Sequence, residues 1–154
     1  RRHSATRVTA MRPRRSAAID RAPMIADSSA WIELLRGTGS AADLRLRQAL
    51  ARGARLLMLY PVYQEVLQGA ANPQKFMQLQ GQLDQVPRYE PDDVHETARR
   101  AAIIYARCRW NGFTPRSPND CLIAACAIEA GEPLLHADRD FDRIAAIEPQ
   151  LQFA

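Results

Sequence analysis

Short apolar segments, each followed by longer helical ones, are the feature that most limits what this chain can fold into. Three such segments, at 24–27, 56–59 and 133–136, are apolar over most of their length and indicate buried strands. Strands without polar alternation are typical of parallel sheets covered by helices on both faces. The alternation therefore predicts an α/β fold, a three-layer α/β/α sandwich with a mostly parallel central sheet.

The segments between these strands carry signals for helix ends. Gly37 ends a predicted helix at 30–36, Ser40 with Asp43 opens the next, and Pro61 lies in the first turn of a third. The predicted helices after the first span about 40–52, 61–69, 74–85, 92–110, 117–131 and 141–147. Residues 151–153 are a candidate edge strand.

The charge of the chain is distributed unevenly. Residues 1–23 carry seven arginines and one aspartate, whereas residues 24–154 carry 14 basic and 16 acidic side chains. The pI of 9.3 therefore reflects the first segment and is no evidence for a nucleic-acid partner. Without hydrophobic periodicity, residues 1–23 are expected to be a disordered extension, or else a basic arm for phosphates, and 24–154 a single domain.

Membrane and disulfide signals are lacking in the sequence. No apolar run approaches the roughly 20 residues of a membrane span, and residues 1–23 lack the apolar core of a secretory signal. Cys108, Cys121 and Cys126 have no metal-site spacing and indicate buried apolar side chains in a reducing compartment. We expect a cytoplasmic protein with no membrane contact.

Four acids are expected to meet at one edge of the predicted sheet. Asp27 ends the first strand, Glu65 lies in the helix after the second, and Asp138 follows the third. Asp120, in the first turn of the helix before the third strand, can join them. Carboxylates about 5 Å apart repel by roughly 3 kcal/mol per pair at an effective dielectric constant of 20. Such a cluster raises its pKa values or binds cations, and oxygen ligands suit Mg²⁺ or Mn²⁺.

Each of these acids also has an ordinary structural explanation. Asp120 fits a capping box, Glu65 a solvated helix position, and Asp138 and Asp140 a turn and a helix cap. Asp27 is the hardest to explain in this way, because the end of a buried strand is a poor place for a structural acid. The hypothesis of a site therefore depends on the joint placement of the acids.

Four segments, in order along the chain, resemble the motifs of PIN domains. Residues 24–31 place an Asp followed by Ser after a strand, and 61–69 place a Glu on a helix that ends in Gly. Residues 119–131 begin with Asn-Asp, and 134–141 set an acid before a terminal Asp-Phe. The resemblance covers about 130 residues, and the compact length resembles the VapC-type toxins of bacterial toxin–antitoxin systems.

This resemblance implies a Mg²⁺- or Mn²⁺-dependent endoribonuclease that forms a homodimer and is inhibited by a cognate antitoxin. It also implies a ligand set for one or two metal ions, with Ser28 or Ser29 hydrogen-bonding behind the ligands. The implied ligands are Asp27, Glu65, Asp120 and Asp138, with Asp140 as an auxiliary. Residues 1–23 have no counterpart in the family pattern.

Two alternatives and two supporting roles remain open at this point. The same site could serve a DNA- or structure-specific nuclease, or the chain could be a protein-binding module whose acids no longer catalyse. Sequence proximity makes four arginines candidates for RNA contacts, namely Arg36, Arg109, Arg116 and Arg139. His136 lies near the predicted site and could contact substrate, although a structural role is commoner for a histidine.

Overall fold

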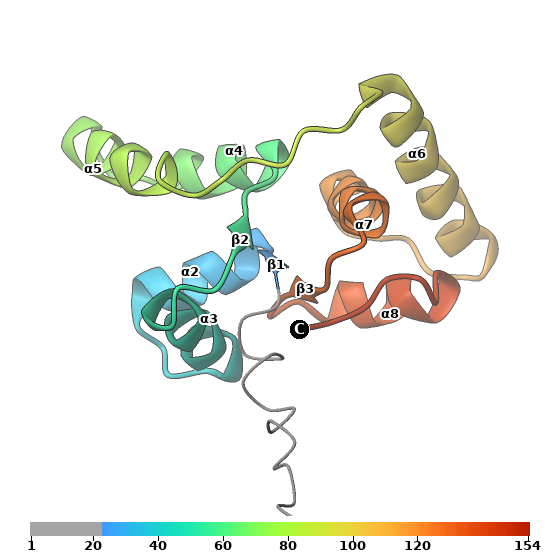
Figure 1. Ribbon diagram of the computed structural model, residues 1–154. Coiled ribbons are helices and arrows are strands. Elements are labelled where there is room, and N and C mark those ends of the chain that lie inside the picture. The colour runs from blue at the N-terminus through green and yellow to red at the C-terminus, as the bar shows by residue number, and fades with distance from the viewer. Residues whose placement is uncertain (1–22) are drawn as a thin grey trace, which may run out of the picture.

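The computed structural model describes residues 23–154, in which three short parallel strands lie between helices (Figure 1). The strands are β1 (Met24–Ala26), β2 (Leu56–Leu57) and β3 (Leu134–Leu135), in the order β2-β1-β3. Met24 pairs with Leu56, and Ile25 with Leu57 and Leu134. The prediction of an α/β fold with a parallel sheet is confirmed, whereas the predicted extension at 1–23 lies outside the described residues except for Pro23.

Helices connect the strands and cover both sides of the sheet. Figure 1 shows helices on both sides of the sheet and further helices across its top. One side carries α2 (Ser28–Arg36) and α3 (Ala41–Ala51), the opposite side carries α6 (Val94–Trp110), α7 (Pro118–Ala130) and α8 (Arg139–Ile147), and α4 (Tyr60–Gln68) and α5 (Pro73–Leu83) lie across the top.

The strands are buried on both faces, which explains their uniformly apolar sequence. Every residue of β1, β2 and β3 is at most 8% exposed. A strand between two helical layers has no solvent-facing side, so the usual alternation of apolar and polar residues is absent. Because all three strands are parallel, the residues that follow them emerge at the same edge.

Most helix ends follow the predicted signals, and two helices begin earlier than predicted. Ser40 accepts a hydrogen bond from the N–H of Asp43 at the start of α3, and Gly37 ends α2 with φ of 61°. α2 begins at residue 28 rather than 30 because Asp27 is its N-cap. α8 begins at residue 139 rather than 141 because Asp138 caps it, accepting from the N–H of Asp140. Acids expected to follow strands therefore also begin helices.

Two isolated bridges extend the pairing at the edges of the sheet. Met58 pairs in parallel with Arg88, a contact that the sequence did not indicate. Phe153 pairs with Leu134, whose N–H donates to the carbonyl of Gln152 at 2.8 Å. The candidate edge strand at 151–153 is therefore reduced to a single bridge beside β3.

The environment of the cysteines agrees with the sequence. Cys108, Cys121 and Cys126 are buried and unpaired.

Within residues 23–154, no helix has the length and apolar character needed to cross a bilayer.

The packing of α3 against α2 gives a stability prediction. Leu46 is fully buried, so Leu46→Ala should lower the free energy of unfolding by about 2–5 kcal/mol through lost burial and a cavity. Leu44, on the same helix, is 51% exposed, so Leu44→Ala should change it by less than about 0.5 kcal/mol. Urea denaturation of both variants and wild type measures the difference, and equal losses would contradict this assignment of the buried face.

Candidate active site

The structure brings the predicted acids together from four elements. Asp27 follows β1, Glu65 lies within α4, Asp120 is in the first turn of α7, and Asp138 precedes α8. The carboxyl group of Asp120 is raised in pKa to about 7, first by burial and then by the charges of the other acids. Those charges belong to Asp27, Asp138, Glu65 and Asp140. The edge formed by the carboxyl ends of the strands is therefore an acidic cluster.

Asp27 is the most constrained member of this cluster. It is 2% exposed, and its N–H donates to the carbonyl of Leu135 at 2.8 Å, which ties it to β3. Its Oδ2 accepts from the N–H and the hydroxyl of Ser29, at 2.9 and 2.6 Å. Its Oδ1 is buried and has no hydrogen-bond partner within the described residues. Burial raises the pKa of Asp27, although the Ser29 hydrogen bonds oppose the rise. A buried carboxylate oxygen without a partner is stabilised by a proton or by a cation.

Glu65 is held in place by two polar neighbours, one from each side of the site. The hydroxyl of Ser28 donates to its Oε2 at 2.5 Å, and the amide of Asn119 donates to its Oε1 at 2.9 Å. These donors come from α2 and α7, so the orientation of Glu65 depends on the packing of three helices. Glu65 is therefore not the freely solvated helix residue of the alternative explanation.

The hydroxyl of Ser29 also connects the two sides of the site. It donates to Asp27, and it accepts from the N–H of Ala137 at 2.9 Å. Ala137 immediately precedes Asp138, so this bond fixes the turn that presents Asp138 beside Asp27. Ser28 and Ser29 thus orient different acids.

Arg116 lies between the last two acids. Its Nη2 donates to Oδ1 of Asp138 at 2.5 Å, and its Nε and backbone N–H donate to Oδ2 of Asp140 at 3.2 and 3.0 Å. Burial alone would raise the pKa of Asp140, but the N–H groups and the charge of Arg116 hold it below its ordinary value. Asp140, expected as an auxiliary ligand, is thus already paired with an arginine in this structure.

The side chain of His136 contacts two aromatic rings and the turn before α8. Its ring lies between those of Phe141 and Phe153, with centroid distances of 5.2 and 4.4 Å. Its Nδ1 accepts from the N–H of Asp138 at 3.3 Å, and its side chain is 12% exposed. These contacts support the structural interpretation of His136, as a residue that fixes the turn before α8.

The donor set fits a hard divalent cation in its chemistry. All five acids offer carboxylate oxygens, and the unpartnered Oδ1 of Asp27 points to a missing positive partner. As oriented here, however, no three Asp, Glu, His or Cys side chains within residues 23–154 stand close enough to share a metal ion. Three of these acids have other partners, since Ser28 and Asn119 donate to Glu65, and Arg116 donates to Asp138 and Asp140. Ligation requires these side chains to turn toward Asp27.

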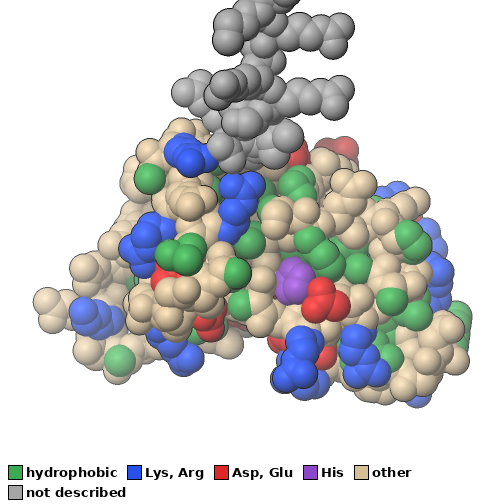
Figure 2. Space-filling model, turned by 90° about the horizontal axis from the view of Figure 1, so that it is seen from below, with side chains coloured by type: hydrophobic (Ala, Val, Ile, Leu, Met, Phe, Trp, Pro, Cys, Tyr) green, Lys and Arg blue, Asp and Glu red, His purple; other side chains and the backbone are tan. Residues whose placement is uncertain are grey.

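The arginines proposed for RNA contacts differ in their positions. Arg116 touches the acids directly, and Arg139 is the exposed first residue of α8. Arg109 lines a hollow with Pro118 and Asn119 at the start of α7, whereas Arg36 lies at the far end of α2. Figure 2 shows basic and acidic side chains intermixed on one face of the molecule, without a broad basic patch there.

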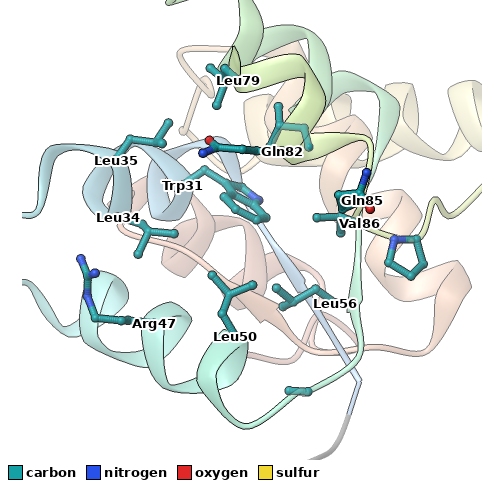
Figure 3. A pocket seen from close by; sticks show the side chains of 13 residues that line it. Trp31, Leu34, Leu35, Arg47, Leu50, Leu56, Leu79, Gln82, Gln85 and Val86 are labelled. Carbon is teal, nitrogen blue, oxygen red and sulfur yellow. The ribbon is translucent and has the colours of Figure 1, made fainter. Parts of the chain in front are cut away.

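An apolar groove of about 550 Å³ lies away from these acids, between α2, α3 and α5 (Figure 3). Trp31, Leu34, Leu50 and Leu56 project into it, and Arg47 lies at its edge. None of the acids of the cluster lines this groove. The groove therefore offers apolar surface, and it is separate from the acid cluster.

Two functional contacts were missed by sequence reasoning. The sequence indicates Asn119 only as part of an Asn-Asp pair and Arg116 only as a candidate for substrate contact, whereas in the structure they donate to Glu65 and to Asp138 and Asp140. A polar side chain next to a predicted ligand was the available signal. Their partners, however, lie 54 and about 22 positions away in the sequence, beyond the reach of local patterns.

Comparison with known proteins gives consistent matches. A family model described as PIN domain matches residues 24–147. Ribonuclease VapC11 of Mycobacterium tuberculosis and VapC ribonuclease Mb1587 of Mycobacterium bovis are each 42% identical over 125 residues, covering 80% of this chain and 92% of the relative. The fold is shared with a chain in the crystal structure of VapBC2 from Rickettsia felis bound to a DNA fragment from their promoter. The TM-score is 0.62 and the sequence identity is 18%. That match covers 86% of this chain and 97% of the other.

The raised pKa of Asp120 gives a pH-dependent stability prediction for metal-free protein. With a pKa near 3.8 when unfolded and about 7 when folded, the folded state binds the extra proton between these values. The contribution of Asp120 to the free energy of unfolding is therefore fully present below pH 4 and is lost as the pH rises to about 7. Asp120→Asn should therefore be more stable than wild type by about 1–3 kcal/mol at pH 8 in EDTA.

The same difference should shrink toward zero as the pH falls to 4. Thermal or urea unfolding of both proteins across this range provides the measurement. A variant that is less stable than wild type at pH 8 would show that the Asp120 carboxylate is not repelled by its neighbours.

Proposed function

The chain belongs to the PIN domain family and, within it, to the VapC ribonucleases, and from this premise we propose how its acid cluster cleaves RNA. The protein is an endoribonuclease, the toxin of a toxin–antitoxin pair. PIN-domain ribonucleases depend on metal ions. The identity of the ion, its ligands and the roles of the surrounding residues are our proposals.

Mg²⁺ or Mn²⁺ is the ion we propose, held by Asp27, Asp120 and Asp138. The observation that carries this proposal is the unpartnered, buried Oδ1 of Asp27 in a cluster whose charges repel one another. The chemistry that such an ion supplies is activation of a water molecule and neutralisation of charge developing on the phosphodiester. Asp140 would serve as an auxiliary ligand only after release from Arg116.

Glu65 would complete the site as a ligand or as the group that orients the attacking water. Ser28 and Asn119 donate to its two oxygens, so its carboxylate is directed by fixed neighbours. A carboxylate positioned in this way can accept a proton from water as the water attacks phosphorus in line, while the opposite P–O bond breaks and the leaving ribose oxygen takes a proton from solvent. Ser29 supports the reaction indirectly, because it orients Asp27 and the turn before Asp138.

The macromolecular partners follow from the family. We propose an RNA substrate, a cognate antitoxin and a homodimer, with the cytoplasm as the place where these partners meet. The structurally similar VapBC2 of Rickettsia felis supports the antitoxin, since its name pairs toxin with antitoxin. Arg109, Arg116 and Arg139 are the proposed contacts for RNA phosphates, which arginine binds through two parallel hydrogen bonds.

Cleavage assays test this function. Purified protein is incubated with a mixed RNA pool and with DNA strands of matched sequence, in Mg²⁺, in Mn²⁺ and in EDTA. Cutting of RNA alone, and only with metal, is expected. Equal cutting of DNA would favour a DNA- or structure-specific nuclease, and binding of a partner without any hydrolysis would favour a non-catalytic module.

Asp27→Asn should reduce RNA cleavage by at least about a hundredfold, because it removes a charged ligand from the centre of the site. The amide can still cap α2, so the circular dichroism spectrum and the melting temperature should remain close to those of wild type. Asp92→Asn, at an exposed position, is the matched control and should cleave normally. Undiminished cleavage by Asp27→Asn would overturn the site.

Asn119→Ala should reduce kcat/KM by about ten- to a hundredfold, because Glu65 loses a donor that directs it. Asn111→Ala removes the same amide from the exposed end of α6 and should have little effect on cleavage. Initial rates at saturating metal provide the comparison. Equal rates for the two variants would show that the orientation of Glu65 does not matter.

A further inference from the structure

Arg116 combines a fixed backbone with an exposed side chain. It lies between the buried Pro115 and Ser117, the N-cap of α7, and its N–H donates to Asp140 at 3.0 Å. Its side chain is nevertheless 72% exposed. The Cα position is therefore set by the fold, while the guanidinium group can change partners without disturbing the core.

The two carboxylates that Arg116 contacts differ in their surroundings. Asp140 is 6% exposed and accepts from both the backbone N–H and Nε of Arg116, so it anchors the residue. The side chain of Asp138 is 29% exposed, and its Oδ1 accepts from Nη2 of Arg116 and from the N–H of Asp140. The carboxylate of Asp138 is therefore the more accessible of the two to a competing cation.

We propose that Arg116 is an internal counter-cation that competes with the divalent ion for Asp138, so that metal binding frees the guanidinium group for an RNA phosphate. The inference rests on the proposed metal-dependent function. It makes Arg116 a positioning residue that couples two ligands, because a metal ion and an RNA phosphate then favour the same arrangement of this side chain.

The strengths of the competing interactions agree with such an exchange. A solvent-exposed ion pair adds little net stability, so the contact between Arg116 and Asp138 is easily broken. A divalent ion carries twice the charge and interacts with several carboxylates at once. The released guanidinium group lies at the edge of the site, where its planar fork suits a phosphate group.

Arg139 provides a matched control. It is the residue after Asp138, carries the same charge and is exposed, and no ion pair is recorded for it within residues 23–154. Removing either charge changes the general electrostatic field near the acids. Only the Arg116 variant also removes a competitor that touches Asp138.

Mn²⁺ binding, followed by electron paramagnetic resonance without RNA, tests the competition directly. Arg116→Gln should bind Mn²⁺ about two- to fivefold more tightly than wild type, whereas Arg139→Gln, which removes only an exposed and salt-screened charge, should change the affinity much less. Arg116→Lys keeps the charge but loses the fork, and should be intermediate. Equal affinities for wild type and Arg116→Gln, or equal tightening in Arg139→Gln, would overturn the inference and leave the metal site intact. No Mn²⁺ binding to wild type would overturn both.

RNA binding tests the coupling. Stopped-flow fluorescence anisotropy, read before cleavage, measures the affinity of labelled RNA in EDTA and in Mn²⁺. Arg116→Gln should match wild type in EDTA and bind more weakly in Mn²⁺, with a salt dependence smaller by about 0.7 in slope, the value of one phosphate contact. The same loss of affinity in both conditions would show that Arg116 does not change partners when metal binds.

Discussion

Repulsion among carboxylates at one edge of the sheet is the constraint on which the rest of this structure depends. Parallel pairing of β1 with β2 and β3 brings the ends of the strands to the same edge. The acids that follow these strands, or lie on adjoining helices, then share a small, partly buried volume. Burial and mutual repulsion raise the pKa of Asp120 to about 7. The fold keeps this unfavourable repulsion at a place where a bound cation would compensate for it.

Neutral and cationic hydrogen-bond donors stabilise the carboxylates against this repulsion. Ser29 stabilises one oxygen of Asp27, Ser28 and Asn119 hold Glu65, and Arg116 neutralises the opposite rim. Each donor also links two elements of the fold. The orientation of the acids therefore depends on the packing of α2, α4 and α7. Among the buried side-chain nitrogen and oxygen atoms of residues 23–154, only Oδ1 of Asp27 lacks a hydrogen-bond partner.

The sequence predicts the features that depend on neighbouring residues. The three strands, the caps at Ser40 and Gly37, and the meeting of Asp27, Glu65, Asp120 and Asp138 follow from periodicity and from the rule for strand ends. The bridge between Met58 and Arg88 and the clamp formed by Arg116 were not predictable. They depend on contacts across the fold, for which no local pattern exists.

The most direct test of a cation centred on Asp27 is anomalous X-ray scattering from crystals of the protein soaked in Mn²⁺. The account predicts a Mn²⁺ peak within coordination distance of Oδ1 of Asp27, with Asp120 and Asp138 turned toward it. A peak elsewhere on the molecule, or none at the acid cluster at saturating Mn²⁺, would contradict it.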